Sequence, residues 1–149
     1  MTVEARYALL VGSKLVDEDR LAPPLPDGMG GQGFIDGAIV LRTGETTLLD
    51  ERFWDRLDES LCLLLKGFEN CINGETVEIE LPDTRLLIEL EQKSPNKANC
   101  TIEYRETVIP LRETHEALSQ CAKRFLAAVV ALPQKTPHIL ELEKLIGGA

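Results

Sequence analysis

The sequence has few of the residues from which catalytic and metal sites are usually built. Its 149 residues include two histidines, seven aromatic residues and four cysteines, with no Cys-X-X-Cys pair. Zinc sites draw on several Cys, His or carboxylate side chains at close spacing. The paired-histidine metalloprotease helix and the Gly-flanked serine of hydrolases are both absent. We therefore expect no metal, no cofactor and no catalytic residue.

Long hydrophobic runs are also missing. The longest uncharged apolar run, residues 125–132, has eight residues, whereas a membrane-spanning helix needs about 20. The first residues include Glu4 and Arg6 and form no apolar core, so we expect no signal peptide. These features predict a cytoplasmic protein without a membrane segment. In that reducing setting the cysteines are expected to be free thiols: Cys62, Cys71, Cys100 and Cys121.

Acidic residues exceed basic ones, and their distribution is uneven. The formal net charge is −9, and residues 50–91 alone hold twelve acidic and four basic side chains, a net charge of −8. Such a surface repels the phosphates of nucleic acids, so nucleic-acid binding is disfavoured. The sign of the charge instead favours a basic protein partner.

The composition, with 44% hydrophobic and 28% charged residues, is that of a globular protein. We expect one α+β domain over residues 1–149 with a Pro/Gly-rich loop at 17–33. The glycines in and after this loop are followed by a strand rather than a helix, unlike a phosphate-binding loop. The loop is therefore expected to be a flexible connection.

Hydrophobic periodicity predicts the order of the elements. We expect a strand at 6–11, a hairpin of 34–42 and 46–49, and a helix over 51–72 with Asp50 as its N-cap. Three strands follow, at 77–81, 86–90 and 100–105, and then helices at 112–132 and 137–146. The three glycine and alanine residues at 147–149 are expected to fray. Together these elements predict one antiparallel sheet of about five to six strands, covered on one face by two long helices, with a short C-terminal helix.

The register of the middle hairpin follows from its alternating pattern. Odd positions are apolar on 77–81 and even positions on 86–90, so paired positions must have an odd index sum and the turn an even length. We predict a two-residue turn at Pro82-Asp83, which places Glu80 opposite Arg85.

Two groups of acidic residues are the candidate binding site. One group stands at the predicted start of the first long helix and the other on one face of the middle hairpin: Asp55, Asp58 and Glu59, and Glu78, Glu80 and Glu89. The helix dipole accounts for acids at a helix start. Like charges on neighbouring strands cost stability, so the strand acids are the stronger candidates for docking a basic partner.

Residues 53–132 resemble a known pattern of small bacterial proteins. The stretch begins with a long helix carrying Trp54, continues through Gly74-Glu75, a strand and Pro82-Asp83 to two further strands, and ends in a helix that starts at Pro110. In this order it resembles uncharacterised domains of the immunity-protein type found in polymorphic toxin systems. The resemblance implies a cytosolic binding protein without a cofactor.

The leading hypothesis is thus an acidic immunity protein that neutralises a toxin by covering its basic active site. One alternative is a small enzyme whose site is assembled from scattered residues such as Glu113, His115 and the glycine loop. Another is an oligomeric structural or adaptor protein that uses a sheet edge or the C-terminal helix.

Overall fold

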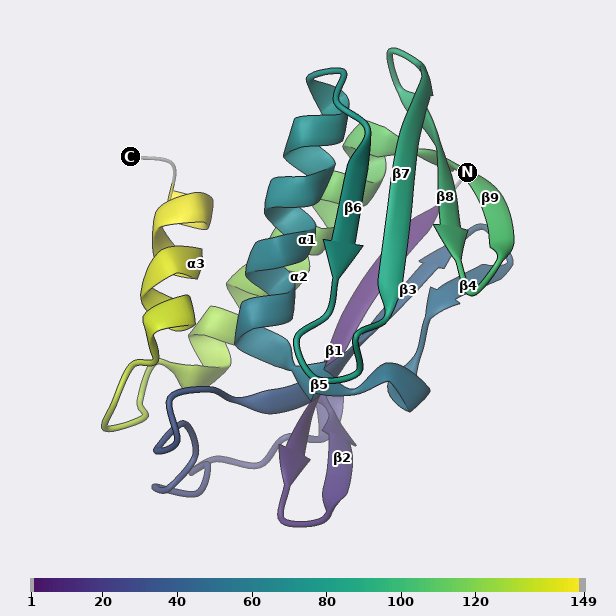
Figure 1. The fold of residues 1–149 in the computed structure, drawn as a ribbon. Coiled ribbons are helices and arrows are strands. Elements are labelled where there is room, and N and C mark those ends of the chain that lie inside the picture. The colour runs from purple at the N-terminus through teal and green to yellow at the C-terminus, as the bar shows by residue number, and fades with distance from the viewer. Residues whose placement is uncertain (1, 148–149) are drawn as a thin grey trace.

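Two antiparallel sheets and three helices form the α+β fold in a computed structural model, which describes residues 2–147 (Figure 1). The first sheet has the order β2-β1-β3-β4, and a short strand, β5, also pairs with β3. Its strands are β1 (Val3–Val11), β2 (Lys14–Asp17), β3 (Asp36–Thr43), β4 (Thr46–Leu49) and β5 (Asp55–Arg56). The second sheet has the order β6-β7-β8-β9, with β6 (Val77–Glu80), β7 (Leu87–Ser94), β8 (Lys97–Ile102) and β9 (Arg105–Pro110). The helices are α1 (Leu57–Ile72), α2 (Leu111–Val129) and α3 (Pro137–Gly147).

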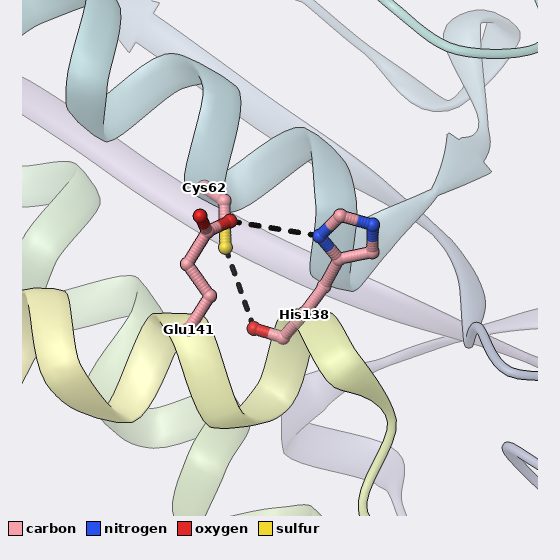
Figure 2. A group of neighbouring side chains, drawn as sticks. All are labelled: Cys62, His138 and Glu141. Atoms are coloured by element: carbon pink, nitrogen blue, oxygen red, sulfur yellow. Dashed lines mark hydrogen bonds and ion pairs between the residues drawn. The ribbon is translucent and has the colours of Figure 1, made fainter.

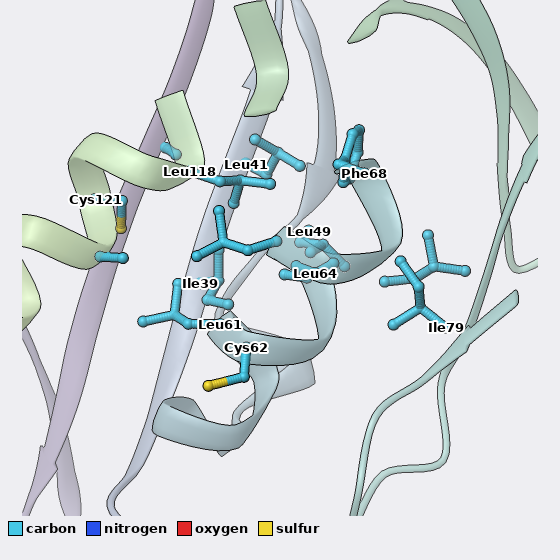
Figure 3. Close-up of a cluster of buried hydrophobic side chains, with 14 of the residues drawn as sticks. Ile39, Leu41, Leu49, Leu61, Cys62, Leu64, Phe68, Ile79, Leu118 and Cys121 are labelled. Atoms are coloured by element: carbon cyan, nitrogen blue, oxygen red, sulfur yellow. The ribbon is translucent and has the colours of Figure 1, made fainter. Parts of the chain in front are cut away.

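The expected single sheet is replaced by two sheets with α1 between them. Helix α1 contacts β3 of the first sheet and β6 and β7 of the second, while α2 packs on β1 and α3 packs on α1. Ten of the sixteen residues of α1 are buried, and Figure 3 shows several of them within the core. A helix that is apolar on several sides needs neighbours on each of those sides. The buried breadth of α1 therefore explains why one sheet is not enough.

Helix α1 starts six residues later than predicted. Asp50 instead caps a single 3₁₀ turn at Glu51–Phe53, where its Oδ1 accepts a hydrogen bond from the Arg52 N–H at 2.9 Å. The next residues form β5, and the Leu57 N–H then donates to the Ile35 carbonyl at 2.7 Å. Pairing with a distant strand thus overrides the local preference for helix. The predicted helix end is confirmed, because Gly74 takes a φ of 99° just after α1.

Gly67 allows α1 to approach the second sheet closely. A Cβ atom added at Gly67 would lie 2.7 Å from Cγ1 of Ile79 on β6, closer than side chains pack. The glycine lowers the helix propensity of α1, yet it lets the helix axis sit against β6. The second sheet is therefore held to the rest of the core through a tight contact along α1.

The faces of the β6–β7 hairpin are as predicted, but its turn is longer. Ile79, Leu81, Ile88 and Leu90 are buried, and paired positions have odd index sums. The predicted two-residue turn is wrong, since the connection runs from 81 to 86 and Glu80 lies opposite Leu87 rather than Arg85. Arg85 adopts a φ of 60° in this connection and still forms an ion pair with Glu80 at 3.1 Å.

Strands β2, β5 and β9 were not predicted. The chain turns at Glu103 and Tyr104, where a continuous strand was expected, and β9 then pairs with β8. Both turn residues have positive φ values, 51° and 66°, a conformation that usually calls for Asn or Gly. The dipeptide Glu-Tyr is not typical of such a turn, so the sequence did not predict the turn.

The remaining elements lie near their predicted positions, although β1 begins at Val3 rather than at residue 6, β8 spans Lys97–Ile102 rather than 100–105, and α2 ends at Val129 rather than at residue 132. The β3–β4 hairpin turns at Gly44-Glu45, and most of 17–33 is irregular apart from the end of β2 and a 3₁₀ turn at Glu18–Arg20. Thr136 caps α3, its Oγ1 accepting from the Ile139 N–H at 3.1 Å. Of the 147–149 tail, residues 148 and 149 lie outside the described residues. No helix within 2–147 has the length and apolarity needed to cross a membrane.

Side chains occupy the edge of β1 that β2 leaves open. Strand β2 pairs only with residues 8–11 of β1. Nearer the N-terminus, the Tyr7 N–H donates to Glu18 Oε2 at 3.0 Å, and Arg124 of α2 donates to the Ala5 carbonyl at 2.7 Å. Glu18 and Arg124 also pair with each other at 2.6 Å. An ion pair thus takes the place of a neighbouring strand.

Candidate acidic binding face

Three glutamates form one row across the outer face of the second sheet. Glu78 on β6 lies opposite Glu89 on β7, Glu89 lies opposite Thr101 on β8, and Thr101 lies opposite Glu106 on β9. We call these four residues the acidic rung. Directly opposite side chains have Cβ atoms about 4.5–5.5 Å apart, so the Glu78 and Glu89 carboxylates repel each other.

The acidic rung is not neutralised within the part of the chain that the structure describes. Glu78, Glu89 and Glu106 are exposed, and across residues 2–147 none of them has an ion-pair partner. The rung lines a shallow hollow of about 240 Å³ together with Glu91 and Asn99. The hollow therefore offers carboxylates that are free to meet cationic groups.

Not all acids on this face are equally available. Glu80 pairs with Arg85, and Glu91 pairs with Lys93 at 3.3 Å. The expectation that Glu78, Glu80 and Glu89 share one exposed face agrees with the structure. Glu106, the fourth-strand member of the acidic rung, was missed because its strand was missed.

A second hollow, with both apolar and charged lining residues, adjoins the acidic rung. Leu87 and Tyr104 are exposed to 41% and 102%. They line a hollow of about 410 Å³ whose other lining residues include Arg85, Glu89 and Glu103. Tyr104 stands at the tip of the β8–β9 turn in the strained left-handed region. Exposed aromatic side chains of this kind often supply the anchor of a protein interface.

The structure places Asp55 away from any binding surface. Asp55 is 2% exposed, and its carboxylate accepts hydrogen bonds from the N–H groups of Asp83 and Thr84 and from the Thr84 hydroxyl, at 2.9–3.2 Å. It therefore organises the connection between β6 and β7. This buried role replaces the partner contact that was expected for Asp55.

Asp58 is also enclosed within the fold. It is 0% exposed, its Oδ1 accepts from the Ile35 N–H at 3.1 Å, and its Oδ2 accepts from the Thr136 hydroxyl. These contacts join the end of the glycine loop and the start of α3 to α1. Asp58 thus belongs to the core and cannot touch a partner in this structure.

Glu59, the third acid of that group, is half-buried and lies beside His138. His138 forms a second cluster of polar side chains with Cys62 and Glu141 (Figure 2). Oε1 of Glu59 lies 3.4 Å from Nε2 of His138, whose Nδ1 lies 3.6 Å from Oε1 of Glu141. The buried Cys62 thiol donates to the His138 carbonyl at 3.4 Å. Glu59 therefore points to α3 rather than to the acidic rung.

Burial and neighbouring charges shift the pKa values of two members of this second cluster. Burial, with the nearby Glu141 carboxylate, raises the pKa of the Cys62 thiol to about 12. Lys66, whose Nζ lies 2.9 Å from Oε2 of Glu141, lowers the pKa of that carboxyl. Sequence reasoning treated Cys62 and His138 separately, because they are 76 residues apart. The sequence signal that could have linked them is the i, i+3 spacing that Glu59 and Cys62 share with His138 and Glu141.

Of the groups in the enzyme alternative, Glu113 and His115 both lie near the start of α2, whereas the glycine loop comes between β2 and β3. Glu113 bonds to the Asn96 amide at 3.0 Å and borders a hollow formed by the β8 and β9 ends. The glycine loop lines another hollow with Leu10, Val11 and Phe34. These two hollows share no lining residue.

Comparisons of the chain with protein-family models, with curated proteins and with solved structures find no match.

Proposed function

We propose that this chain is a binding protein that docks a basic protein partner on the outer face of its second sheet. The observation that carries the proposal is the acidic rung: three carboxylates in one row that form no ion pair among residues 2–147. Like charges placed directly opposite each other destabilise a sheet. A bound cationic surface would remove that repulsion, so the partner's binding would be favoured.

Two exposed hydrophobic side chains in the neighbouring hollow support the same proposal. Charged groups speed encounter and set specificity, whereas buried aromatic and aliphatic anchors supply most of the affinity. Leu87 and Tyr104 lie beside the acidic rung. The partner's surface is therefore proposed to present Lys or Arg side chains next to an apolar side chain.

The resemblance of residues 53–132 to immunity-type domains supports one form of this function. In that form the partner is a toxin enzyme with a basic active-site cleft, and the second sheet covers the cleft and excludes the substrate. The proposed partner-binding residues are Glu78, Glu80, Glu89 and Glu106. Asp55 and Asp58 are left out because they are buried.

A matched pair of variants tests the proposal. The rung variant carries Glu78→Gln, Glu89→Gln and Glu106→Gln. The control variant carries the same substitution at three exposed glutamates elsewhere: Glu4, Glu45 and Glu69. Both variants lose the same charge, so differences between them report position. Circular dichroism should show both folded, since the rung substitutions remove repulsion.

Each chain is used to capture proteins from a lysate of the source organism, and captured proteins are quantified by mass spectrometry. We expect a basic protein that the wild type and the control variant retain and the rung variant loses. With that protein purified, calorimetry should give an at least tenfold weaker Kd for the rung variant, and wild-type binding should weaken with added salt. Equal capture by all three chains would refute the proposal.

A further inference from the structure

Helices α1 and α3 pack against each other, and each presents a pair of side chains that can bind a metal ion. Helix α1 offers Glu59 and Cys62, and α3 offers His138 and Glu141, both at i, i+3 spacing, which puts each pair on one helix face. Facing helices with such pairs are a common way to build a metal site inside a bundle. The packing of α3 on α1 brings the two pairs together.

The ligand atoms are already close to one another. One ligand atom each of Cys62, His138 and Glu141 lies within 4.8 Å of the other two. Figure 2 shows the Glu141 carboxylate next to the Cys62 side chain, with the imidazole ring of His138 beside them. A tetrahedral zinc site, with bonds of about 2.0–2.3 Å, places its ligand atoms about 3.3–3.8 Å apart. The 3.6 Å between Nδ1 of His138 and Oε1 of Glu141 already meets this spacing.

We propose that Cys62, His138 and Glu141 bind a zinc ion between α1 and α3. A thiolate, an imidazole and a carboxylate form a ligand set that suits Zn²⁺ and is poor for Mg²⁺ or Ca²⁺. The ion replaces the thiol proton of Cys62, and that proton is released to solvent. His138 and Glu141 are partly exposed, with side-chain exposures of 34% and 39%, so the ion can enter from solvent and keep a water as its fourth ligand.

Glu59 and Lys66 complete the surroundings. With Nδ1 of His138 on the metal, Nε2–H of the ring faces Glu59 Oε1 at 3.4 Å. A carboxylate that receives the second ring N–H fixes the imidazole orientation in many zinc sites. Lys66 holds the other oxygen of Glu141, Oε2, and leaves Oε1 for the metal. The thiolate and the Glu141 carboxylate balance the two charges of the ion, and Arg56, whose Nη1 lies 3.9 Å from Oε1 of Glu59, faces the Glu59 carboxylate.

Cobalt titration of the full chain, freed of metal with a chelator, tests the proposal. We expect one Co²⁺ per chain, with a thiolate-to-cobalt charge-transfer absorption and the strong visible bands of a tetrahedral site, all displaced by Zn²⁺ and unaffected by Mg²⁺. Cys62→Ala should abolish the charge-transfer band. The matched control Cys121→Ala, which removes another buried thiol, should keep it.

Two further variants keep the proposal falsifiable if Cys62→Ala does not fold. His138→Ala changes a partly exposed side chain and should abolish stoichiometric zinc uptake. Glu59→Gln should weaken zinc binding about 10- to 100-fold while leaving the charge-transfer band in place. The proposal is overturned if the wild type shows no such band, if Mg²⁺ displaces the bound metal, or if His138→Ala binds zinc as the wild type does. None of these results bears on the acidic rung, which lies on another face.

Discussion

Substitution of Asp58 by alanine should destabilise the fold far more than its position in an acidic segment suggests. The carboxylate accepts hydrogen bonds from the Ile35 N–H and the Thr136 hydroxyl, and it is fully buried. Hydrogen bonds to a charged group contribute about 1.5–3 kcal/mol each, and buried donors left without an acceptor carry a further cost. Asp58→Ala should therefore lower the free energy of unfolding by about 3–5 kcal/mol, a large share of the 5–15 kcal/mol typical of a folded domain.

Urea unfolding followed by circular dichroism measures this loss. With an m value of about 2 kcal/mol/M, the unfolding midpoint should fall by about 2 M. Glu59→Ala is the control, because the neighbouring side chain is half-buried and makes only long ion pairs, and it should cost less than about 1 kcal/mol. The unfolding midpoint of Asp58→Asn should fall between those of Asp58→Ala and Glu59→Ala. The amide oxygen of asparagine can accept a hydrogen bond from one donor, while its NH₂ group meets the other donor. A midpoint for Asp58→Ala close to that of Glu59→Ala would refute the assignment of Asp58 to the core.

Three other predictions concern packing, thiol chemistry and pH. Gly67→Ala should lower the free energy of unfolding by about 1 kcal/mol despite alanine's higher helix propensity, because the new methyl group meets Ile79. Urea titrations should show that adding Ile79→Val recovers part of this loss. A Gly67→Ala chain that is more stable than the wild type would contradict the close contact. Burial raises the pKa of the Cys121 thiol to about 12. Peptide mapping should therefore find Cys121 unmodified by maleimide in the native chain at pH 8 and modified in urea. Rapid labelling of Cys121 in the native chain would instead show that the thiol is accessible. Hydrogen bonds from Arg6 hold the pKa of Asp17 below its usual 3.8. The stability that Asp17 adds should therefore be complete above pH 4 and disappear as the pH falls through the pKa of Asp17 in the folded chain. A stability difference between wild type and Asp17→Asn that stays constant down to pH 2 would argue against this linkage.

Local patterns in the sequence predicted the elements whose residues are determined by near neighbours. The alternation of Ile79 and Ile88 with glutamates identified both strands and their outer faces, and the Thr136-Pro137 pair marked the start of α3. These features depend on side-chain periodicity and capping, which act within a few residues.

Features that depend on distant partners were not predictable. Residues 55 and 56 became a strand because β3 offered hydrogen bonds, and the Glu103-Tyr104 turn lacks the glycine or asparagine that usually marks it. For the same reason the sequence placed Asp55 and Asp58 on a helix surface, whereas tertiary contacts bury them. Glu106 joined the candidate face only once β9 was paired.

The ion pair along β1 has a consequence for how copies of this chain behave in solution. An open strand edge is a template on which another chain can add its own strand, the first step of many aggregates. On β1 the Tyr7 N–H and the Ala5 carbonyl are held by Glu18 and Arg124, so an incoming strand would first have to separate two opposite charges. The same contact that ties α2 to the first sheet thus also protects concentrated protein from self-association at this edge.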